Sequence, residues 1–187
     1  MCYYFFVVLV GFFVAGFGSK VSADEWKSKE IEILEMPTWF QKAGLTKGIR
    51  QDKQSLGIIL PANVEIEVRQ TNPDFTNVLS LQLLNDDQVT ERQVNVTSNW
   101  QTFSSKYVTV PFVVTPQATV RPVLEYRVKG TSKVLPTYMA GDRESEFFKE
   151  WDDTNAEFGL ITSRYFQMLV PKVDKTILKK NARILFC

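Results

Sequence analysis

The sequence contains no histidine and only two cysteines among its 187 residues. Without histidine the chain cannot form a Ser-His-Asp or Cys-His catalytic arrangement, nor the His-Glu-x-x-His motif of zinc peptidases. A zinc site would then need cysteines. Cys2 lies in an N-terminal segment that we expect to be removed, so Cys187 alone remains. An intramolecular disulfide is thereby excluded, whereas Cys187 could pair between chains. We predict no catalytic residue, no metal and no cofactor for this chain.

An excess of charge of one sign is also lacking. The chain has 22 basic and 21 acidic residues, and Lys20 is the single charged residue among residues 1–23. Loss of that segment leaves 21 residues of each sign. This balance gives no electrostatic reason to expect nucleic acid or an anionic membrane as a partner.

Long hydrophobic runs are absent after the first few residues. Residues 3–17 are apolar apart from glycines, and Val21-Ser22-Ala23 follows shortly after them. This pattern is typical of a signal peptide cleaved after Ala23, although the basic start of such peptides is missing. An uncleaved anchor or a core element is the alternative. The run is short for a membrane span, which needs about 20 apolar residues. We therefore predict a secreted, extracellular protein with no membrane span after signal removal.

Alternation of apolar and polar residues predicts β-strands from about residue 55 onward. The alternating runs are residues 64–69, 79–83, 107–114 and 120–128, with turn residues between them. Strands of this length and spacing favour an antiparallel β-sandwich of jelly-roll-like type. Pro111 and Pro122 fall inside such runs, and we expect edge strands or bulges at both, because proline lacks the N–H of a central ladder.

Helical signals are few. Residues 144–155 place Phe147, Phe148 and Trp151 on one apolar face, which predicts an amphipathic helix. A second short helix is predicted from Asp174, with Ile177 and Leu178 facing inward. Residues 158–170 are expected to form one further strand. The fold class predicted is therefore mainly β, with one or two short helices. The expected division is a signal peptide (1–23), an N-terminal extension (24–50), the sandwich (51–172) and the start of a following segment (173–187).

Candidate binding residues are aromatic or modifiable side chains. Trp39 and Trp100 lie beside polar, turn-like sequence, and exposed indoles can stack on the apolar faces of sugar rings. They are the two candidates for glycan binding, with core packing as the alternative. Asn95-Val96-Thr97 is a glycosylation sequon that a eukaryotic secretory pathway could use. Acidic groups such as Asn85-Asp86-Asp87 are expected to be turns, because they lack the ligand density of a calcium loop, and a carboxylate-only calcium site is the alternative.

Several stretches together resemble the start of enhancin-like, M60-type zinc peptidases. The stretches that carry the resemblance are Pro37-Thr38-Trp39-Phe40, Gln54-Ser55-Leu56-Gly57-Ile58-Ile59-Leu60-Pro61-Ala62, Arg69-Gln70-Thr71-Asn72-Pro73, residues 81–87, residues 136–139, Phe147-Phe148-Lys149-Glu150-Trp151 and Tyr165-Phe166-Gln167-Met168-Leu169-Val170-Pro171. These stretches occur in the same order as in that family, and the resemblance extends over about residues 30–180.

The resemblance implies a β-sandwich that precedes the zinc domain of a secreted metallopeptidase acting on mucin-like glycoproteins. The zinc ligands of that family lie on a His-Glu-x-x-His helix, which this chain does not contain. We therefore expect a leading domain truncated before the catalytic motif, without catalytic activity of its own, that contacts mucin-type glycoproteins or glycans. A standalone secreted module that binds carbohydrate or glycoprotein is the alternative.

Overall fold

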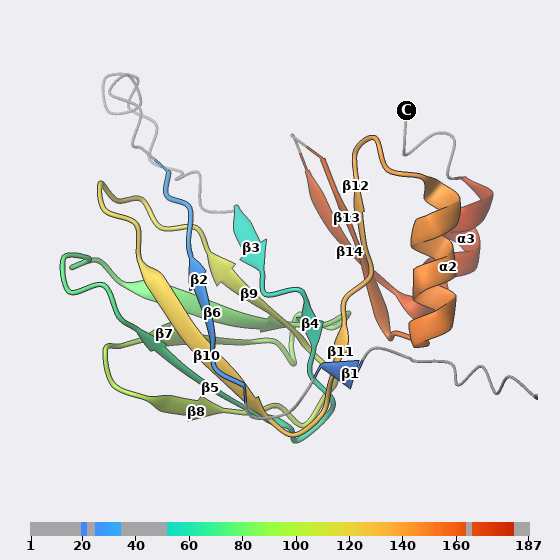
Figure 1. Cartoon of the computed structure of the whole chain (residues 1–187). Helices are drawn as coiled ribbons and strands as arrows, with labels where there is room; N and C mark the ends of the chain where they lie inside the picture. Colours follow the sequence, from blue (N-terminus) through green and yellow to red (C-terminus); the bar gives the residue numbers. More distant parts are fainter. Residues whose placement is uncertain (1–19, 22–24, 35–51, 164–165, 182–187) are drawn as a thin grey trace, which may run out of the picture.

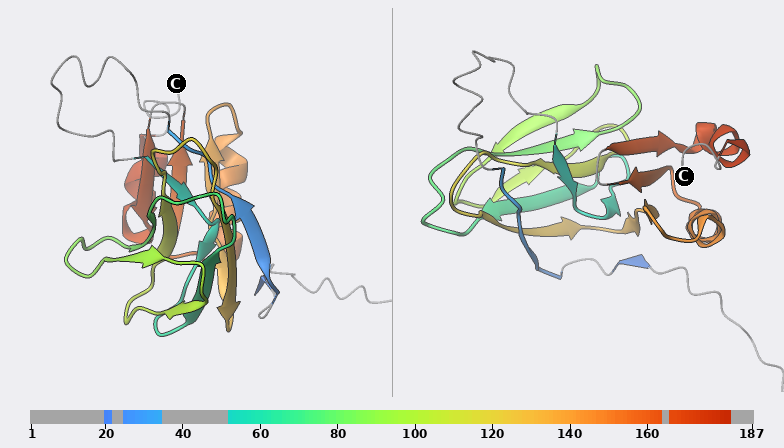
Figure 2. Two further views of the ribbon diagram at one scale, coloured as in Figure 1. Left: turned by 90° about the vertical axis from the view of Figure 1, so that its left-hand side faces the viewer. Right: turned by 90° about the horizontal axis from the view of Figure 1, so that it is seen from above.

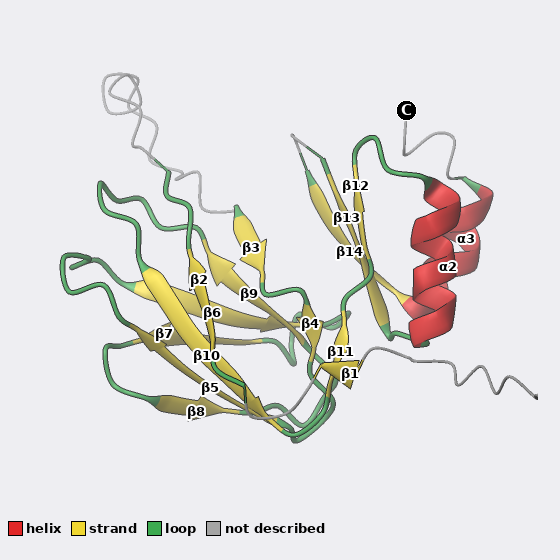
Figure 3. Cartoon of the chain, viewed as in Figure 1, coloured by secondary structure: helices red, strands yellow, loops and turns green. Residues whose placement is uncertain are grey.

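The computed structural model describes residues 20–21, 25–34, 52–163 and 166–181. Strands are the main secondary structure of this part of the chain, and they form four sheets (Figure 3). The mainly β fold class predicted from the sequence is confirmed. None of the helices in the described ranges combines the length and the apolar character that a membrane span needs.

Two four-stranded antiparallel sheets face each other as a sandwich (Figure 1). The first sheet has the order β2 (Lys27–Glu30), β10 (Val123–Lys129), β5 (Glu65–Gln70) and β8 (Gln101–Phe103). The second has the order β3 (Lys53–Ser55), β9 (Val110–Val114), β6 (Leu79–Leu84) and β7 (Arg92–Val96). A small sheet at one end consists of β1 (Lys20–Val21), β11 (Ser132–Val134) and β4 (Ile58–Ile59).

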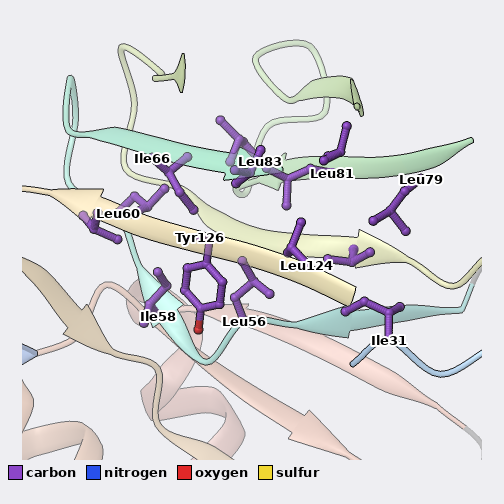
Figure 4. Close-up of a cluster of buried hydrophobic side chains, with 14 of the residues drawn as sticks. Ile31, Leu56, Ile58, Leu60, Ile66, Leu79, Leu81, Leu83, Leu124 and Tyr126 are labelled. Atoms are coloured by element: carbon purple, nitrogen blue, oxygen red, sulfur yellow. The ribbon is translucent and has the colours of Figure 1, made fainter. Parts of the chain in front are cut away.

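The sandwich core is built by alternate residues of its central strands. Leu79, Leu81 and Leu83 of β6 are buried, as are Ile66 of β5 and Leu124 of β10. Figure 4 shows these side chains between the two sheets. Because successive side chains of a strand point to opposite faces, one alternating run supplies both a buried and a solvent-facing row. The strands predicted from alternation at residues 64–69 and 79–83 are confirmed.

The fourth sheet and the helices form a second layer beside the sandwich. Its strands are β12 (Thr137–Met139), β13 (Phe158–Thr162) and β14 (Gln167–Pro171), and its helices are α2 (Glu144–Thr154), the 3₁₀ turn η1 (Lys172–Asp174) and α3 (Lys175–Lys180). β12 and β13 are parallel, with α2 as the connection between them. Both helices lie on the side of this sheet that faces away from the sandwich (Figures 1 and 2).

The second layer has its own hydrophobic core around Trp151 of α2. The Trp151 side chain is 1% exposed, and its indole N–H donates to the backbone C=O of Ala156 at 2.9 Å. Phe147 and Phe148 are also buried, as the amphipathic pattern predicts. The helix ends at Asn155, which adopts the left-handed conformation at φ 47° that asparagine tolerates better than most residues. The predicted helix over residues 144–155 is thus confirmed.

Two sequence predictions for the second layer are wrong. Residues 158–170 are two strands of a hairpin rather than one strand. Ile177 is 61% exposed, so only Leu178 of α3 faces inward. In the sandwich, Pro111, which was expected in an edge strand or at a bulge, lies in the central strand β9 and not at an edge. A central proline is tolerated there because the ladder on one side of β9 is interrupted at Pro111. β3 pairs with β9 only as far as Phe112, and the next bridge joins Leu60 to Thr109. The missing N–H of Pro111 faces this interruption.

The division of the chain at residue 172 stays a prediction. The two hydrophobic cores are distinct, but they share strand β9, because Val113 belongs to the sandwich core while its neighbour Phe112 packs in the second core. Ile59 of β4 also packs in the second core. The sandwich and the second layer are therefore joined through common strands rather than through a linker.

Candidate functional site

The outer face of the sheet β2–β10–β5–β8 carries a regular array of charged side chains. Its two central strands carry charged side chains at every second position: Glu65, Glu67 and Arg69 on β5, and Glu125, Arg127 and Lys129 on β10. The register sets each acid opposite a base, with Arg69 across from Glu125, Glu67 across from Arg127 and Glu65 across from Lys129. Opposite charges at directly facing positions stabilise an antiparallel pair.

These facing residues form a network of ion pairs. Nη2 of Arg69 lies 2.7 Å from a carboxylate oxygen of Glu125. The two oxygens of Glu67 are engaged separately, one by Nε of Arg127 at 2.6 Å and the other by Nζ of Lys129 at 2.6 Å. The Glu67 side chain is 13% exposed, and the two cations compensate for that partial burial.

Two tryptophans extend over this network from the outer strands. Trp26 precedes β2 and Trp100 precedes β8, and their ring centroids are 4.0 Å apart with the planes tilted by 37°. The guanidinium carbon of Arg127 lies 4.1 Å from the Trp26 ring, and that of Arg69 lies 4.4 Å from the Trp100 ring. Guanidinium groups stack favourably on indole faces.

The distances imply a continuous column in the order Arg127, Trp26, Trp100, Arg69. Two planar groups within about 4.5 Å of one ring centroid cannot share a face of that ring, so each indole has one partner on either side. The Trp26 and Trp100 side chains are nevertheless 46% and 39% exposed. What this column presents to solvent is therefore the rims of the two indoles and not their faces.

The network predicts a specific response to acid. Hydrogen bonds from Lys129 and Arg127 hold the pKa of Glu67 below its ordinary value of 4.5. A carboxyl group whose pKa is lowered by folding stabilises the folded state above the unfolded pKa, and that contribution is lost as the pH falls through the folded pKa. We measure the melting temperature from neutral pH to about pH 3. As the pH falls over this range, the melting temperature of Glu67→Gln should decrease less than that of the parent.

Glu65→Gln is the matched control on the same strand. The Glu65 carboxylate is 3.5 Å from Lys129 and its side chain is 48% exposed, so its ion pair contributes less. The two variants should therefore differ on the acid limb, with Glu65→Gln close to the parent. Equal acid limbs for the parent and Glu67→Gln would contradict the assignment of this limb to Glu67.

The structure places the sequence-predicted candidates differently. Trp39 lies outside the described residues. Trp100 is half-exposed within the column, with its faces occupied, so its role in glycan binding stays a prediction that now concerns the ring edge. Asn95 lies exposed on the edge strand β7, and its side-chain oxygen accepts a hydrogen bond from Ser80 at 3.1 Å. Its use as a glycosylation site also stays a prediction.

Sequence reasoning missed Trp26 as a partner of Trp100. The two residues are 74 positions apart in the numbering, and they meet only because strands from four parts of the chain are neighbours in one sheet. No local pattern contains that information. Within the described ranges, no cluster of three or more acidic or cysteine side chains is arranged to hold a metal ion. In the turn after β6, the Asn85 side chain caps the backbone N–H of Asp87 at 2.7 Å, as an Asx turn does.

Comparison with known proteins finds relatives among the viral-enhancing factors. The chain is 27% identical over 149 residues to the viral-enhancing factor of Pseudalatia unipuncta granulosis virus, a match that covers 76% of this chain and 16% of that protein. The viral-enhancing factor of Trichoplusia ni granulosis virus is 26% identical over the same length and coverage. The chain thus spans about a sixth of the length of these relatives. No protein-family model matches it.

Solved structures share the fold at low sequence identity. The M60 catalytic domain of ZmpC from Clostridium perfringens, in complex with the sialyl T antigen, aligns with a TM-score of 0.61 at 15% identity, over 83% of this chain and 36% of that one. IMPa from Pseudomonas aeruginosa in complex with an O-glycopeptide aligns with a TM-score of 0.56 at 10% identity, over 90% of this chain and 20% of that one. The resemblance of this chain to the enhancin-like, M60-type metallopeptidases is therefore confirmed in sequence and in fold.

Proposed function

We propose that this chain is the β-rich, secreted leading module of an enhancin-like, M60-type metallopeptidase, and that it contacts mucin-type glycoproteins without cleaving them. The observation that carries the proposal is the relation to viral-enhancing factors together with a fold shared with M60 domains. Hydrolysis by a metallopeptidase needs a metal-activated water, and the chain has no histidine to hold the metal.

The glycoprotein contact is supported by what the related structures hold. ZmpC carries the sialyl T antigen, and IMPa carries an O-glycopeptide. In this chain, Trp26 and Trp100 are half-exposed and lie side by side, and an indole carries an N–H donor on its rim, which suits the hydroxyl groups of sugars. We place the contact on this rim, with Trp39 as a further candidate.

The test is an incubation of the purified chain with immobilised mucin, in which retention and cleavage are measured together. We expect retention without new mucin fragments, and no effect of added zinc or of a chelator on either readout. A metal that bound the folded chain would also raise its melting temperature by mass action. Chelator-sensitive mucin cleavage, or a zinc-dependent rise of several degrees in melting, would refute catalytic silence.

Tryptophan variants locate the contact. Trp100→Ala should weaken retention on mucin severalfold, because a stacking or edge contact contributes about 1 kcal/mol. Trp26→Phe keeps an aromatic partner for Trp100 but removes the N–H of Trp26, so it should weaken retention less than Trp100→Ala does. If neither variant nor Trp39→Ala changes retention while all remain folded, the contact does not lie on these tryptophans. If the parent chain is not retained on mucin at all, two hypotheses are refuted. One is the leading module that contacts mucin, and the other is the standalone binding module.

A further inference from the structure

The sheet face that carries the two tryptophans also presents two hydroxyl groups. Ser28 of β2 lies directly opposite Glu125 of β10, and Thr102 of β8 lies directly opposite Glu67 of β5. Directly facing residues of an antiparallel pair have their side chains on the same face, so both hydroxyls flank the charged array of β5 and β10. Both residues are exposed. Hydroxyl groups donate and accept hydrogen bonds, and they therefore suit the hydroxyl groups of sugars.

The cations of the charged array are each engaged by a carboxylate of the same face. Nε and Nη2 of Arg69 lie 2.8 and 2.7 Å from one oxygen of Glu125. Arg127 and Lys129 engage the two oxygens of Glu67 separately. Because each base of the array faces an acid across the two strands, the array has no net charge.

The border of this face along β2 is balanced in the same way. Arg121 is paired with Glu30 at 2.8 Å and with Glu32 at 2.9 Å. Lys27 and Lys29 of β2 point to the opposite face, because they pair with residues of β10 whose side chains are buried in the sandwich. Among the described residues, this face therefore has no cation that is free to receive an acidic group of a ligand.

An acidic group brought to the indole rims therefore gains little. It would meet the carboxylates of Glu67 and Glu125 as well as their cations, so attraction and repulsion offset each other. It would also lose part of its hydration, which costs free energy unless a cation replaces the water. A neutral sugar has neither the repulsion nor that hydration cost, and its hydroxyl groups can pair with the hydroxyls of Ser28 and Thr102 and with the indole N–H groups.

On the basis of the proposed contact with mucin-type glycoproteins, we propose that this face selects neutral glycans, and that the hydroxyls of Ser28 and Thr102 bind sugar hydroxyls beside the two tryptophans. Glycans that end in an acidic sugar such as sialic acid bind more weakly, because the array has no unpaired cation for their carboxylate. The pairing of Arg69 with Glu125 sets this preference, since Arg69 is the cation that lies against Trp100.

The experiment measures the retention of the full chain on immobilised mucin before and after treatment of the mucin with sialidase. Removal of sialic acid uncovers neutral sugars and removes carboxylates, so we expect retention to increase at least about threefold. Retention on the treated mucin should change less than about twofold between about 50 and 300 mM sodium chloride, because salt screens charged groups and not hydrogen bonds between neutral ones.

Two acid-to-amide variants test the role of the ion pairs. Glu125→Gln leaves Arg69 without its carboxylate, so this variant should gain at least about threefold in retention on untreated mucin. Glu30→Gln is the matched control, because it removes one acid from the same face while Arg121 keeps Glu32 as a partner at 2.9 Å. The control should be retained as the parent is. Melting temperatures establish that both variants are folded.

Hydroxyl variants test the contact with the sugar itself. Ser28→Ala and Thr102→Val each remove one hydroxyl at an exposed position, and each should lower retention on treated mucin at least about twofold. Ser28→Thr and Thr102→Ser keep the hydroxyl, and they should be retained as the parent is.

Each readout has a result that would overturn the proposal. Retention that is equal or higher on untreated mucin refutes the preference for neutral glycans, while the contact with mucin stands. If Glu125→Gln is retained like Glu30→Gln on untreated mucin, Arg69 does not set the preference. If Ser28→Ala and Thr102→Val are retained like the parent, the two hydroxyls are not part of the site. A parent chain that is retained on neither form of mucin refutes this proposal and the proposed function together.

Discussion

Gly159→Ala is expected to destabilise the protein by about 3 kcal/mol, at the upper end for overpacked cores. Gly159 lies in β13 against the indole of Trp151, and a β-carbon on it would lie 2.6, 2.7 and 2.8 Å from three atoms of that ring. Gly159 is buried, and Trp151 belongs to the second core, where it is 1% exposed and has little room to move aside. The measurement is the free energy of unfolding in urea, followed by circular dichroism.

A double-mutant cycle isolates the clash with Trp151. Trp151→Leu alone should cost several kcal/mol, because it leaves a cavity and removes the hydrogen bond to Ala156. In that background, Gly159→Ala should cost much less than in the parent, since the leucine leaves room for the methyl group. Additive costs, or a stable Gly159→Ala single variant, would show that the backbone of β13 moves easily and that the close approach is not essential.

The sequence predicted the sandwich well where buried and exposed side chains alternate along a strand. β5 and β6 alternate strictly between core and solvent, so residues such as Ile66 and Leu81 were identifiable from spacing alone. The helix α2 was equally clear, because Phe147, Phe148 and Trp151 recur at helical spacing. These elements are fixed by local patterns that hold whatever they pack against.

The second layer was harder to predict because its central strand, β13, is buried on both faces. β13 is buried at four successive positions, so it has no alternation, and the turn that separates it from β14 was not recognised. The exposure of Ile177 could not be derived either, since α3 is a short helix whose inward face is set by β14. The prediction errors for β13, β14 and α3 arose because their sequences show no clear periodic pattern, and not because a pattern suggested another structure.

The candidate site was only half predictable for a different reason. Trp100 was selected from its polar surroundings, but its partners Trp26, Arg69 and Arg127 come from three other strands or their flanks. Cross-strand neighbours depend on sheet order and register, which involve pairs far apart in the sequence. A reader of the sequence could have noted that β5 and β10 carry complementary charges at alternate positions, and this is the one local sign that the two strands are neighbours.

Leu81→Ala is expected to cost about 3 to 4 kcal/mol, within the range for fully buried leucines. Leu81 is 0% exposed and lies in β6 between Val94 of β7 and Val113 of β9. Few groups could move into the cavity, because the strands on both sides are held by their ladders. Ser80→Ala on the opposite face of the same strand is the control, and it should change stability by about 1 kcal/mol or less, since it removes one exposed hydrogen bond to Asn95.

Leu81→Ala also tests whether the sandwich core and the second core unfold together. Leu81 belongs to the sandwich core, whereas Trp151 reports on the second core from within it. Because Val113 and Phe112 of β9 pack in different cores, loss of the sandwich would remove one wall of the second core. We therefore expect Leu81→Ala to shift the urea transition equally by circular dichroism and by tryptophan fluorescence, with the fluorescence measured in a Trp26→Phe, Trp39→Phe, Trp100→Phe background that leaves Trp151 as the reporter. If the fluorescence transition stays at the parent's midpoint while the circular dichroism transition moves, the second layer is stable without the sandwich and β9 does not couple the cores.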